Sequence, residues 1–354
     1  MSRFLSRRFA ALEAYAPGEQ PQDMPYVKLN TNESPFPPSP EVIAAVSAAQ
    51  VEKLNLYPDP TCRRLKEKLA AFYGLAPENL FIANGSDDIL NFFFMAFCDE
   101  SRPVAFPAVS YGFYPVYADL YRLPHRAVPL REHFRLEPED YRGLNQNIVI
   151  ANPNSPTGRA ISPAEVETIA ASNPDHVVLI DEAYVDFGGE SCRELLPRYE
   201  NLLVCQTFSK SRSLAGGRLG FTMGSAALIA DLEKMKYSTN PYSINRLTLA
   251  AAEAAVDSSG YYRENCRVIM ENRSYTVDAL AQLGFETVPS RANFIFTRCR
   301  RLKGEFLYRS LKERGVLVRH WDKPEIRDYI RVTIGTRAQM DRFLEQVRMI
   351  LKEE

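Results

Sequence analysis

Three short apolar runs in the middle of the chain, each followed by polar residues, constrain the fold more than any other feature. They are NIVIAN (147–152), HVVLIDEAY (176–184) and NLLVCQTFS (201–209), and a helical pattern at 163–172 separates the first two. A fourth run, GRLGFTMGS (217–225), continues the series. Short apolar strands that alternate with helices are typical of a parallel sheet buried on both faces. We therefore predict an α/β fold with a mostly parallel central sheet sandwiched by helices.

Polar residues gather where these predicted strands end. Asn154, Asp181 and Lys210 each follow a successive strand, at intervals of 27 and 29 residues. In open α/β sheets, ligands bind at the carboxyl ends of the strands. The order of these three residues therefore predicts one shared site.

Composition excludes several classes of function. Of the 354 residues, 45% are apolar and 25% are charged, which is ordinary for a globular protein, and the net charge of -1 gives no basic field for nucleic acid or anionic membranes. No apolar run is long enough to span a bilayer. The six cysteines form no C-x-x-C pair and the four histidines have no ligand spacing, so we expect no metal site. The first twenty residues do not resemble a secretory signal, so we expect a cytoplasmic protein.

Changes in residue pattern along the chain predict an N-terminal arm and two domains. Residues 1–40 include TNESPFPPSP, whose prolines exclude a helix interior or a central strand, so we expect an arm that packs on the smaller domain. Residues 41–245 contain the alternating pattern and are expected to form the large domain. Residues 246–354 begin with a long helical region and then carry few strands, which favours a smaller α+β domain.

The stretch TFSKSRSLAGGRLG (207–220) suggests a lysine held beside a bound phosphate. An enzyme that uses pyridoxal 5′-phosphate needs a lysine amine for a Schiff base and a phosphate cup. Lys210 is the candidate amine, and Ser209 and Arg218 are candidates for the cup, because a guanidinium reaches two phosphate oxygens.

Two further segments supply the remaining groups that this cofactor needs. Asp181 would pair with the protonated pyridine nitrogen, and Tyr184 would donate to the ring oxygen. Ser86 and Asp87 follow Gly85 and precede an apolar helix, whose first N–H groups form a natural phosphate site.

Each element also has a simpler interpretation. Lys210 alone is more often a surface lysine, Ser86 and Asp87 could be a helix cap, and NPNSPTG could be a plain turn. YGFYPVYADLY (111–121) could be aromatic core. Their order along the chain favours the shared site.

With these motifs on hand, the chain resembles the fold-type I pyridoxal-phosphate aminotransferases of class I/II, and among them the histidinol-phosphate branch. The resemblance runs nearly end to end. It rests on LNTNESPFPPSP (29–40), LYPDP (56–60), NGSDD (84–88), YGFY (111–114), NPNSPTG (152–158), DEAY (181–184), TFSKSRSLAGGRLG (207–220), ANFIF (292–296) and IRVTIGT (330–336).

The resemblance implies a role for each matching residue. Lys210 would form the Schiff base and move the proton at the substrate α-carbon, Asp181 would hold the pyridinium, and Tyr111 would stack on the ring. The resemblance also implies that the cofactor phosphate is bound by Ser86, Asp87, Ser209 and Arg218. It implies a homodimer in which Tyr57 reaches the cofactor of the other subunit. The substrate's anionic group would be bound by Arg331 or Arg319, and Tyr15 and Asn30 would close over the substrate.

Two departures from the family pattern concern the cofactor. The family often has asparagine directly before PTG, where it meets the ring oxygen together with the tyrosine. Here that position is Ser155 and Asn154 precedes it, so either residue could make the contact. The family also often has leucine at position 217, where this chain has glycine.

The resemblance implies transamination of L-histidinol phosphate with 2-oxoglutarate, which gives imidazole acetol phosphate and glutamate. An aromatic-amino-acid aminotransferase and a threonine-phosphate decarboxylase of the same family remain alternatives, because a pocket arginine accepts a phosphate or a carboxylate. A regulatory module without catalysis is disfavoured by Lys210, Asp181 and Arg218. A nucleotide-binding protein is disfavoured because neither a P-loop nor a G-x-G-x-x-G motif is present.

Overall fold

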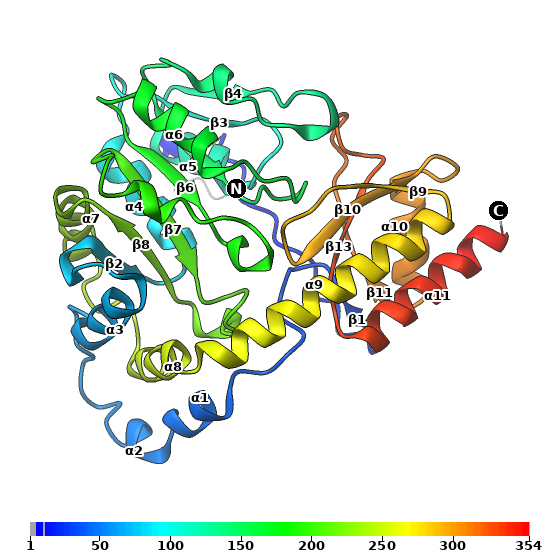
Figure 1. Cartoon of the computed structure of the whole chain (residues 1–354), viewed down its shortest axis with the longest axis horizontal. Coiled ribbons are helices and arrows are strands. Elements are labelled where there is room, and N and C mark those ends of the chain that lie inside the picture. Colours follow the sequence, from blue (N-terminus) through cyan, green and yellow to red (C-terminus); the bar gives the residue numbers. More distant parts are fainter. Residues whose placement is uncertain (1–4, 10, 354) are drawn as a thin grey trace.

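The computed structural model describes residues 5–9 and 11–353, and its largest element is a seven-stranded sheet (Figure 1). The strand order is β2-β8-β7-β6-β5-β3-β4. Every neighbouring pair is parallel except the two that involve β8. The strands are β2 (Leu80–Ala83), β3 (Val104–Pro107), β4 (His125–Val128), β5 (Asn147–Ala151), β6 (Val178–Asp181), β7 (Leu202–Thr207) and β8 (Gly220–Gly224).

Both faces of this sheet are buried. In β6, Val178 and Ile180 point into one apolar core, while Leu179 points into another. This period-two alternation explains why the strands read as continuous apolar runs. The helices of this domain are α3 (Arg63–Tyr73), α4 (Ser86–Phe97), α5 (Phe113–Tyr121), α6 (Pro163–Ser172), α7 (Ala226–Thr239) and α8 (Arg246–Asp257). The fold class predicted from the runs is confirmed in this respect.

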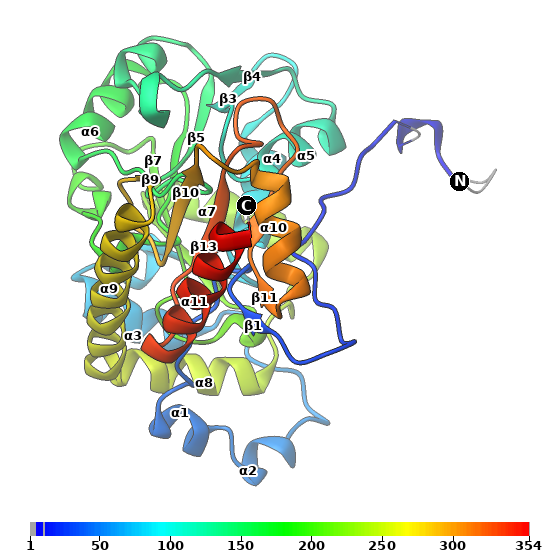
Figure 2. The ribbon, with the colours of Figure 1, turned by 90° about the vertical axis from the view of Figure 1, so that its right-hand side faces the viewer.

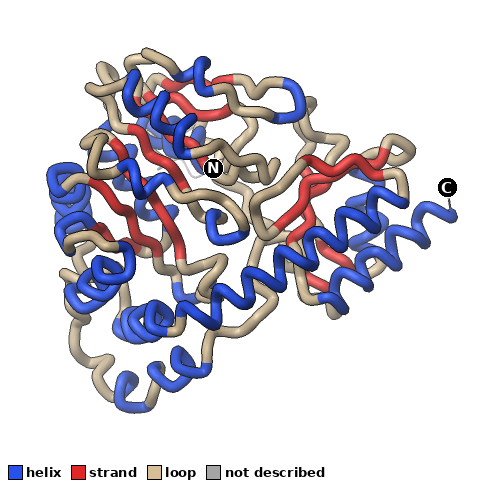
Figure 3. Tube along the Cα trace, viewed as in Figure 1, coloured by secondary structure: helices blue, strands red, loops and turns tan. Residues whose placement is uncertain are grey.

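A second, smaller sheet lies in the C-terminal part of the chain, and all its pairs are antiparallel (Figure 3). Its order is β12-β13-β10-β9, with bounds β9 (Phe285–Val288), β10 (Phe294–Cys299), β12 (Arg319–His320) and β13 (Ile330–Thr333). The helices α9 (Ser259–Gln282), α10 (Gly304–Glu313) and α11 (Arg337–Glu353) pack with it. A separate apolar core joins these elements, which gives the small domain its own interior.

The N-terminal segment contacts the small domain. Strand β1 (Val27–Lys28) pairs in parallel with β11 (Val316–Leu317). Figure 2 shows this segment running along one side of the molecule before it reaches α1 and α2. Residues 1–4 and 10 of the predicted arm lie outside the described residues.

Helices α1 and α8 both belong to the core of the large domain. The segment after Ser39 forms two helices, α1 (Pro40–Ala45) and α2 (Ala48–Val51), and Ser39 Oγ caps the first by accepting from Val42 N–H. Helix α8 packs on α1 and α3 in the large core, and the change from one core to the other lies within α9.

Short 3₁₀ segments complete the secondary structure. They are η1 (Arg7–Phe9), η2 (Pro77–Asn79), η3 (Glu132–Phe134), η4 (Pro138–Tyr141), η5 (Val185–Phe187), η6 (Cys192–Leu195) and η7 (Ala215–Gly217). Within the described ranges, no helix combines the length and the apolar character that crossing a bilayer requires.

Candidate active site

A cavity of about 950 Å³ is lined by the N-terminal arm, the loops after β5, β6 and β7, the start of α4, and strands β12 and β13. The site residues predicted from sequence number fourteen, and twelve of them line this cavity. The twelve are Tyr15, Asn30, Ser86, Asp87, Tyr111, Asp181, Tyr184, Ser209, Lys210, Arg218, Arg319 and Arg331. The structure therefore brings together the ends of the parallel strands and the arginines of the small domain.

Asp181 is a buried carboxylate whose hydrogen-bond partners are neutral. It ends β6, and it accepts hydrogen bonds from Tyr114 Oη at 3.2 Å and from the backbone N–H of Ala183 at 3.2 Å. Burial raises the pKa of Asp181 to about 6, while Tyr114 and Ala183 act in the opposite direction. A carboxylate in this setting suits a positively charged N–H group, which would hold it ionised.

Lys210 follows β7 and lies beside Tyr184. Its Nζ donates to the backbone oxygen of Thr31 at 3.3 Å and lies 5.8 Å from the centre of the Tyr184 ring. Tyr184 Oη accepts from Asn32 Nδ2 at 3.0 Å, so its own proton remains available for donation. Asn32 is held in turn by Thr333, which donates to its side-chain oxygen.

A charged cluster stands at the start of α4. Arg218 donates to Asp87 Oδ2 at 3.2 Å, and Tyr111 Oη donates to Asp87 Oδ1 at 2.8 Å. Arg218 has a left-handed backbone with φ of 53°, which lets it leave the η7 turn and enter β8. Asp87 also stands in the first turn of α4, where the helix dipole favours negative charge. Asp87 thereby fixes Tyr111 and Arg218 on one wall.

Glycine allows the backbone to approach closely behind this cluster. Gly85 precedes α4 with φ of 86°, a conformation that other residues rarely adopt. A Cβ on Gly220 would lie 2.6 Å from the backbone of Gly85 and Ser86. The β2–β8 pair therefore sets the position of the first N–H groups of α4, which can hold an anion.

The hydroxyl of Ser209 adds to this wall. Thr207 Oγ1 donates to Ser209 Oγ at 3.0 Å and accepts from the Ser209 backbone N–H at 3.1 Å. This local arrangement turns the chain at the end of β7 and precedes Lys210.

Arg331 forms the opposite wall and is only 8% exposed. Its guanidinium donates to Ser155 Oγ at 3.0 Å and to the backbone oxygen of Asn30 at 2.9 Å, while Nε has no hydrogen-bond partner among the described residues. Burial is the main cause that lowers the pKa of Arg331, and the positive charge of Arg319 adds to it. Such a group gains from an anion in the cavity.

Arg319 connects this wall to the N-terminal arm. Its guanidinium donates to the backbone oxygens of Ala16 at 2.7 Å and Pro17 at 2.9 Å. Tyr15, the residue before Ala16 in the arm, stacks on Phe113 of the large domain, with ring centres 4.1 Å apart. The arm therefore crosses the cavity from the small domain to the large one.

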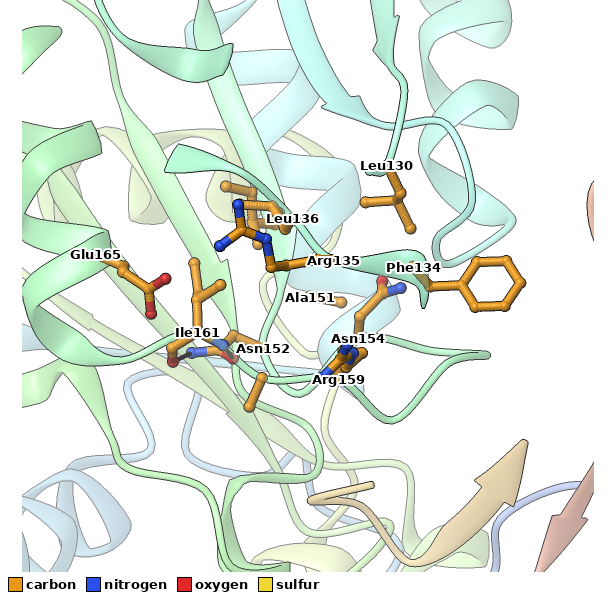
Figure 4. Close-up of a pocket in the computed structure, with 12 residues that line it drawn as sticks. Leu130, Phe134, Arg135, Leu136, Ala151, Asn152, Asn154, Arg159, Ile161 and Glu165 are labelled. Carbon is orange, nitrogen blue, oxygen red and sulfur yellow. Dashed lines mark hydrogen bonds between the residues drawn. The ribbon is translucent and has the colours of Figure 1, made fainter. Parts of the chain in front are cut away.

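The structure does not bring Asn154 to this cavity. Its side-chain amide donates to Thr157 Oγ1 and the Val109 backbone oxygen, both at 3.0 Å, and accepts from Ser110 Oγ at 2.7 Å. Asn154 instead lines a smaller neighbouring cavity of about 120 Å³, beside Arg159 (Figure 4). Ser155, the other candidate for the ring oxygen, lines the large cavity.

Tyr57 also lies away from the cavity. Its ring is 78% exposed and stacks on Tyr242, with ring centres 4.4 Å apart. The stretch of sequence before Tyr57, from α1 to the segment after α2, also exposes apolar side chains, namely Ile43, Val46, Val51, Leu54 and Leu56.

A buried chain of polar side chains lies next to the ends of β6 and β7. Arg212 donates to Tyr73 Oη at 2.9 Å, Tyr73 donates to Gln206 Oε1 at 2.8 Å, and Gln206 donates to Glu182 Oε2 at 2.9 Å. Burial raises the pKa of Glu182 to about 7. This chain joins the residue after Asp181 to the loop of Lys210.

Sequence reasoning missed four residues at this site. Asn32, Tyr114 and Thr31 contact predicted site residues, and Trp321 lines the wall with the arginines. Tyr114 lies in a segment whose aromatic residues suggest only core, and it is both fully buried and bonded to Asp181. No group of three or more potential metal-ligating side chains occurs in the part of the chain that the structure describes.

Comparison with known proteins finds similarity along the whole chain. Residues 25–347 match the family described as aminotransferase class I and II. The chain is 48% identical to histidinol-phosphate aminotransferase 1 of Bradyrhizobium diazoefficiens, over 99% of this chain and 100% of that protein. It is 45% identical to histidinol-phosphate aminotransferase of Brachyspira hyodysenteriae, again over 99% and 100%.

Solved structures show the same fold. Histidinol-phosphate aminotransferase from Sinorhizobium meliloti, solved in complex with pyridoxal-5′-phosphate, superposes with a TM-score of 0.88 over 100% of this chain and 99% of that chain. The sequence identity of this pair is 22%, so the likeness concerns the fold. It confirms the predicted fold-type I architecture.

Proposed function

The chain belongs to the class I and II aminotransferases, and from this premise we propose that it transfers the amino group of L-histidinol phosphate to 2-oxoglutarate. The products are imidazole acetol phosphate and glutamate, a step of histidine biosynthesis. The observation that carries the proposal is that one cavity joins Lys210, Asp181 and Arg218 with Arg319 and Arg331. The full-length similarity to histidinol-phosphate aminotransferases supports the choice of substrate.

The residues of the cavity fit pyridoxal 5′-phosphate. Asp181 is buried among neutral donors and its pKa is raised, which suits a protonated ring nitrogen. Gly220 lies directly against the backbone of Gly85 and Ser86, at the start of α4, where the first N–H groups of a helix suit a phosphate. When bound, this cofactor supplies an aldehyde that captures amines and a ring that takes up electrons.

The chain's own groups then divide the work. Lys210 Nζ takes the proton from the substrate α-carbon and returns one in the reverse half-reaction, which is general acid–base catalysis by one amine. Asp181 would hold the ring N–H of the cofactor, and Tyr184 would donate to its ring oxygen. Tyr111 would pack against the ring, and Ser155 is better placed than Asn154 to support Tyr184, because the Asn154 amide is hydrogen-bonded elsewhere.

The cofactor phosphate would be held by the start of α4 and the loop after β7. Arg218 supplies positive charge, Ser209 and Ser86 supply hydroxyl and N–H donors, and Asp87 orients Arg218. Across the cavity, the substrate's anionic group would meet the two small-domain arginines, while Tyr15 and Asn30 close the arm side.

The first test is the visible absorption of the protein loaded with pyridoxal phosphate. We expect L-histidinol phosphate, added without a keto acid, to bleach the band, and 2-oxoglutarate to restore it. Lys210→Ala should abolish the cycle, whereas Lys28→Ala should keep it, because Lys28 pairs with Glu33 and does not line the cavity.

Other outcomes would redirect the proposal. Bleaching by phenylalanine or tyrosine alone would indicate an aromatic-amino-acid aminotransferase, and release of carbon dioxide from threonine phosphate would indicate the decarboxylase. A protein that binds no pyridoxal phosphate would contradict the cofactor assignment.

The proposal includes a homodimer in which Tyr57 reaches the cofactor site of the partner subunit. The exposed apolar side chains around Tyr57 support it, because a surface of this kind gains from being covered. A cytoplasmic location is also proposed, since all six cysteines are free and buried.

Hybrid dimers test the reach of Tyr57. Lys210→Ala and Tyr57→Ala proteins are each expected to be nearly inactive. Mixing them after mild dissociation should restore activity if Tyr57 acts across the interface, because one site in each hybrid then has both residues. Activity that does not return would place Tyr57 in its own subunit's site, and a monomer in sedimentation analysis would contradict the dimer.

A further inference from the structure

Trp321, the one tryptophan of the chain, lies beside both arginines of the substrate wall. Its ring centre is 5.4 Å from the guanidinium carbon of Arg319 and 5.2 Å from that of Arg331. Both distances are within the range of cation–π attraction. On the other side, Trp321 packs on the apolar cluster of Phe296 and Ile326, and it also lines the cavity. The indole is therefore a supported contact surface for two cations.

These two arginines face each other directly across strands. Arg319 of β12 pairs with Arg331 of β13 in antiparallel register, so both side chains leave the same face of the sheet. Their hydrogen-bond partners are neutral oxygens. Like charges directly opposite are unfavourable. A pair built this way gains most from an anion that carries more than one charge.

The two arginines are held to different degrees. Arg331 is buried and keeps three further contacts: Ser155 Oγ, the Asn30 backbone oxygen, and the Phe294 ring at 5.2 Å. Arg319 is half-buried, and Trp321 and two arm carbonyls are its contacts. Loss of the indole would therefore affect the position of the Arg319 side chain far more than that of Arg331.

We propose that Trp321 makes this site select a phosphate dianion over a carboxylate, by holding Arg319 beside Arg331. A carboxylate carries one charge and is satisfied by the guanidinium of Arg331, which its other contacts fix. A phosphate monoester carries nearly two charges and needs both guanidiniums. Trp321 is in this sense a positioning residue for specificity. The inference rests on the proposed function, because it concerns the end of the cavity that would receive the substrate phosphate.

The test compares the two half-reactions in the cofactor-loaded enzyme. We expect Trp321→Leu to raise the half-saturating concentration of L-histidinol phosphate about tenfold, the equivalent of one partly buried cation–π contact. The value for glutamate should change by less than about threefold, within the spread of a surface contact. Trp321→Phe keeps an aromatic face and should restore most of the preference.

Tyr329→Leu is the matched control. Tyr329 belongs to the same apolar cluster and stacks on Phe296 with ring centres 4.6 Å apart, but it does not line the cavity. It should lower the melting temperature and leave the ratio between the two substrates unchanged. Equal losses for both substrates in Trp321→Leu would mean that Trp321 only supports the fold. Unchanged values would mean that the indole does not select the anion.

Inorganic phosphate separates this inference from the proposed function. In the glutamate half-reaction of the wild-type enzyme, inorganic phosphate should act as a competitive inhibitor. In Trp321→Leu, the inhibition constant for phosphate should be about tenfold higher. If the wild type fails to use L-histidinol phosphate, the proposed substrate is wrong, while the phosphate inhibition still decides the role of Trp321. If wild type and Trp321→Leu are inhibited equally, the inference is overturned.

Discussion

Gly220 offers the sharpest test of how the backbone builds the cofactor phosphate site. It begins β8 and pairs with Ala83 of β2, directly behind the turn into α4. A Cβ at this position would lie 2.6 Å from Gly85 C and 2.6 Å from Ser86 N. Both are backbone atoms, so no side chain can rotate away. Gly220→Ala must therefore displace either β8 or the first turn of α4.

The size of the effect follows from these contacts. To reach an ordinary contact of 3.4 Å, the two segments must separate by about 0.8 Å. Overpacking of this kind costs about 1–3 kcal/mol in the free energy of unfolding. The shift also moves the N–H groups that would hold the phosphate. Losing one hydrogen bond to a charged group, worth about 1.5–3 kcal/mol, would weaken cofactor binding roughly 10- to 100-fold.

The assay is a titration of the cofactor-free protein with pyridoxal phosphate, together with melting curves. Gly217→Ala is the control in the same loop. Its Cβ would meet Leu214 Cβ at 3.5 Å, an ordinary contact, and its cofactor affinity should match that of the wild type. Wild-type affinity in Gly220→Ala would refute the idea that this glycine sets the position of α4.

Two further substitutions probe the buried polar chain beside the strand ends. Burial raises the pKa of Glu182 from 4.5 to about 7, so between these pH values the folded protein binds a proton that the unfolded chain releases. The free energy of unfolding of the wild type, relative to that of Glu182→Gln, should therefore fall by up to about 3 kcal/mol as the pH rises from about 4.5 to 7. Urea unfolding at several pH values measures this difference. A pH-independent difference would contradict this. Arg212→Leu should lower the free energy of unfolding by about 1.5–3 kcal/mol, because it removes the hydrogen bond that a buried guanidinium donates to the Tyr73 hydroxyl, which then keeps only Gln206 as its partner. An unchanged urea midpoint would show that this hydrogen bond contributes nothing to stability.

Burial of both faces made four strands predictable, although it did not suffice for every strand. Strands β5, β6, β7 and β8 show every residue buried, and their apolar runs stand out from the segments between them. Strand β3 is equally buried, but its run of four residues ends in proline, which is not typical of a central strand. The run of β2 passes into the apolar helix α4 after a short turn, so no polar interval separates the two patterns. In β4, His125, Arg126 and Ala127 are exposed, so this strand carries little apolar signal.

The candidate site divides in the same way. Asp181 and Lys210 were predictable because Asp181 ends β6 and Lys210 lies three residues after the end of β7, and the topology of a parallel sheet brings strand ends together. The contact of Asn32 with Tyr184 joins positions 152 residues apart, which no local pattern encodes. Asn154 was predicted to face the cofactor as an alternative to Ser155, but the NPNSPTG turn consumes its amide through Thr157. Side chains in a strong turn motif are often used for hydrogen bonds within the turn, so they are poor candidates for ligand contacts.

The two sheets carry different parts of the chemistry, and the arm joins them. The large sheet presents the groups proposed to bind the cofactor at its strand ends, whereas β12 and β13 of the small sheet present the arginines proposed for the substrate's anion. Arg319 donates hydrogen bonds to the backbone oxygens of Ala16 and Pro17 in the arm. Tyr15, in the same segment, stacks on Phe113 of the large domain. An anion that draws Arg319 inward therefore acts on a segment that also contacts the large domain. Binding energy from the phosphate end can in this way help to fix the arm over the reacting end, which is how an enzyme uses a remote part of its substrate for positioning.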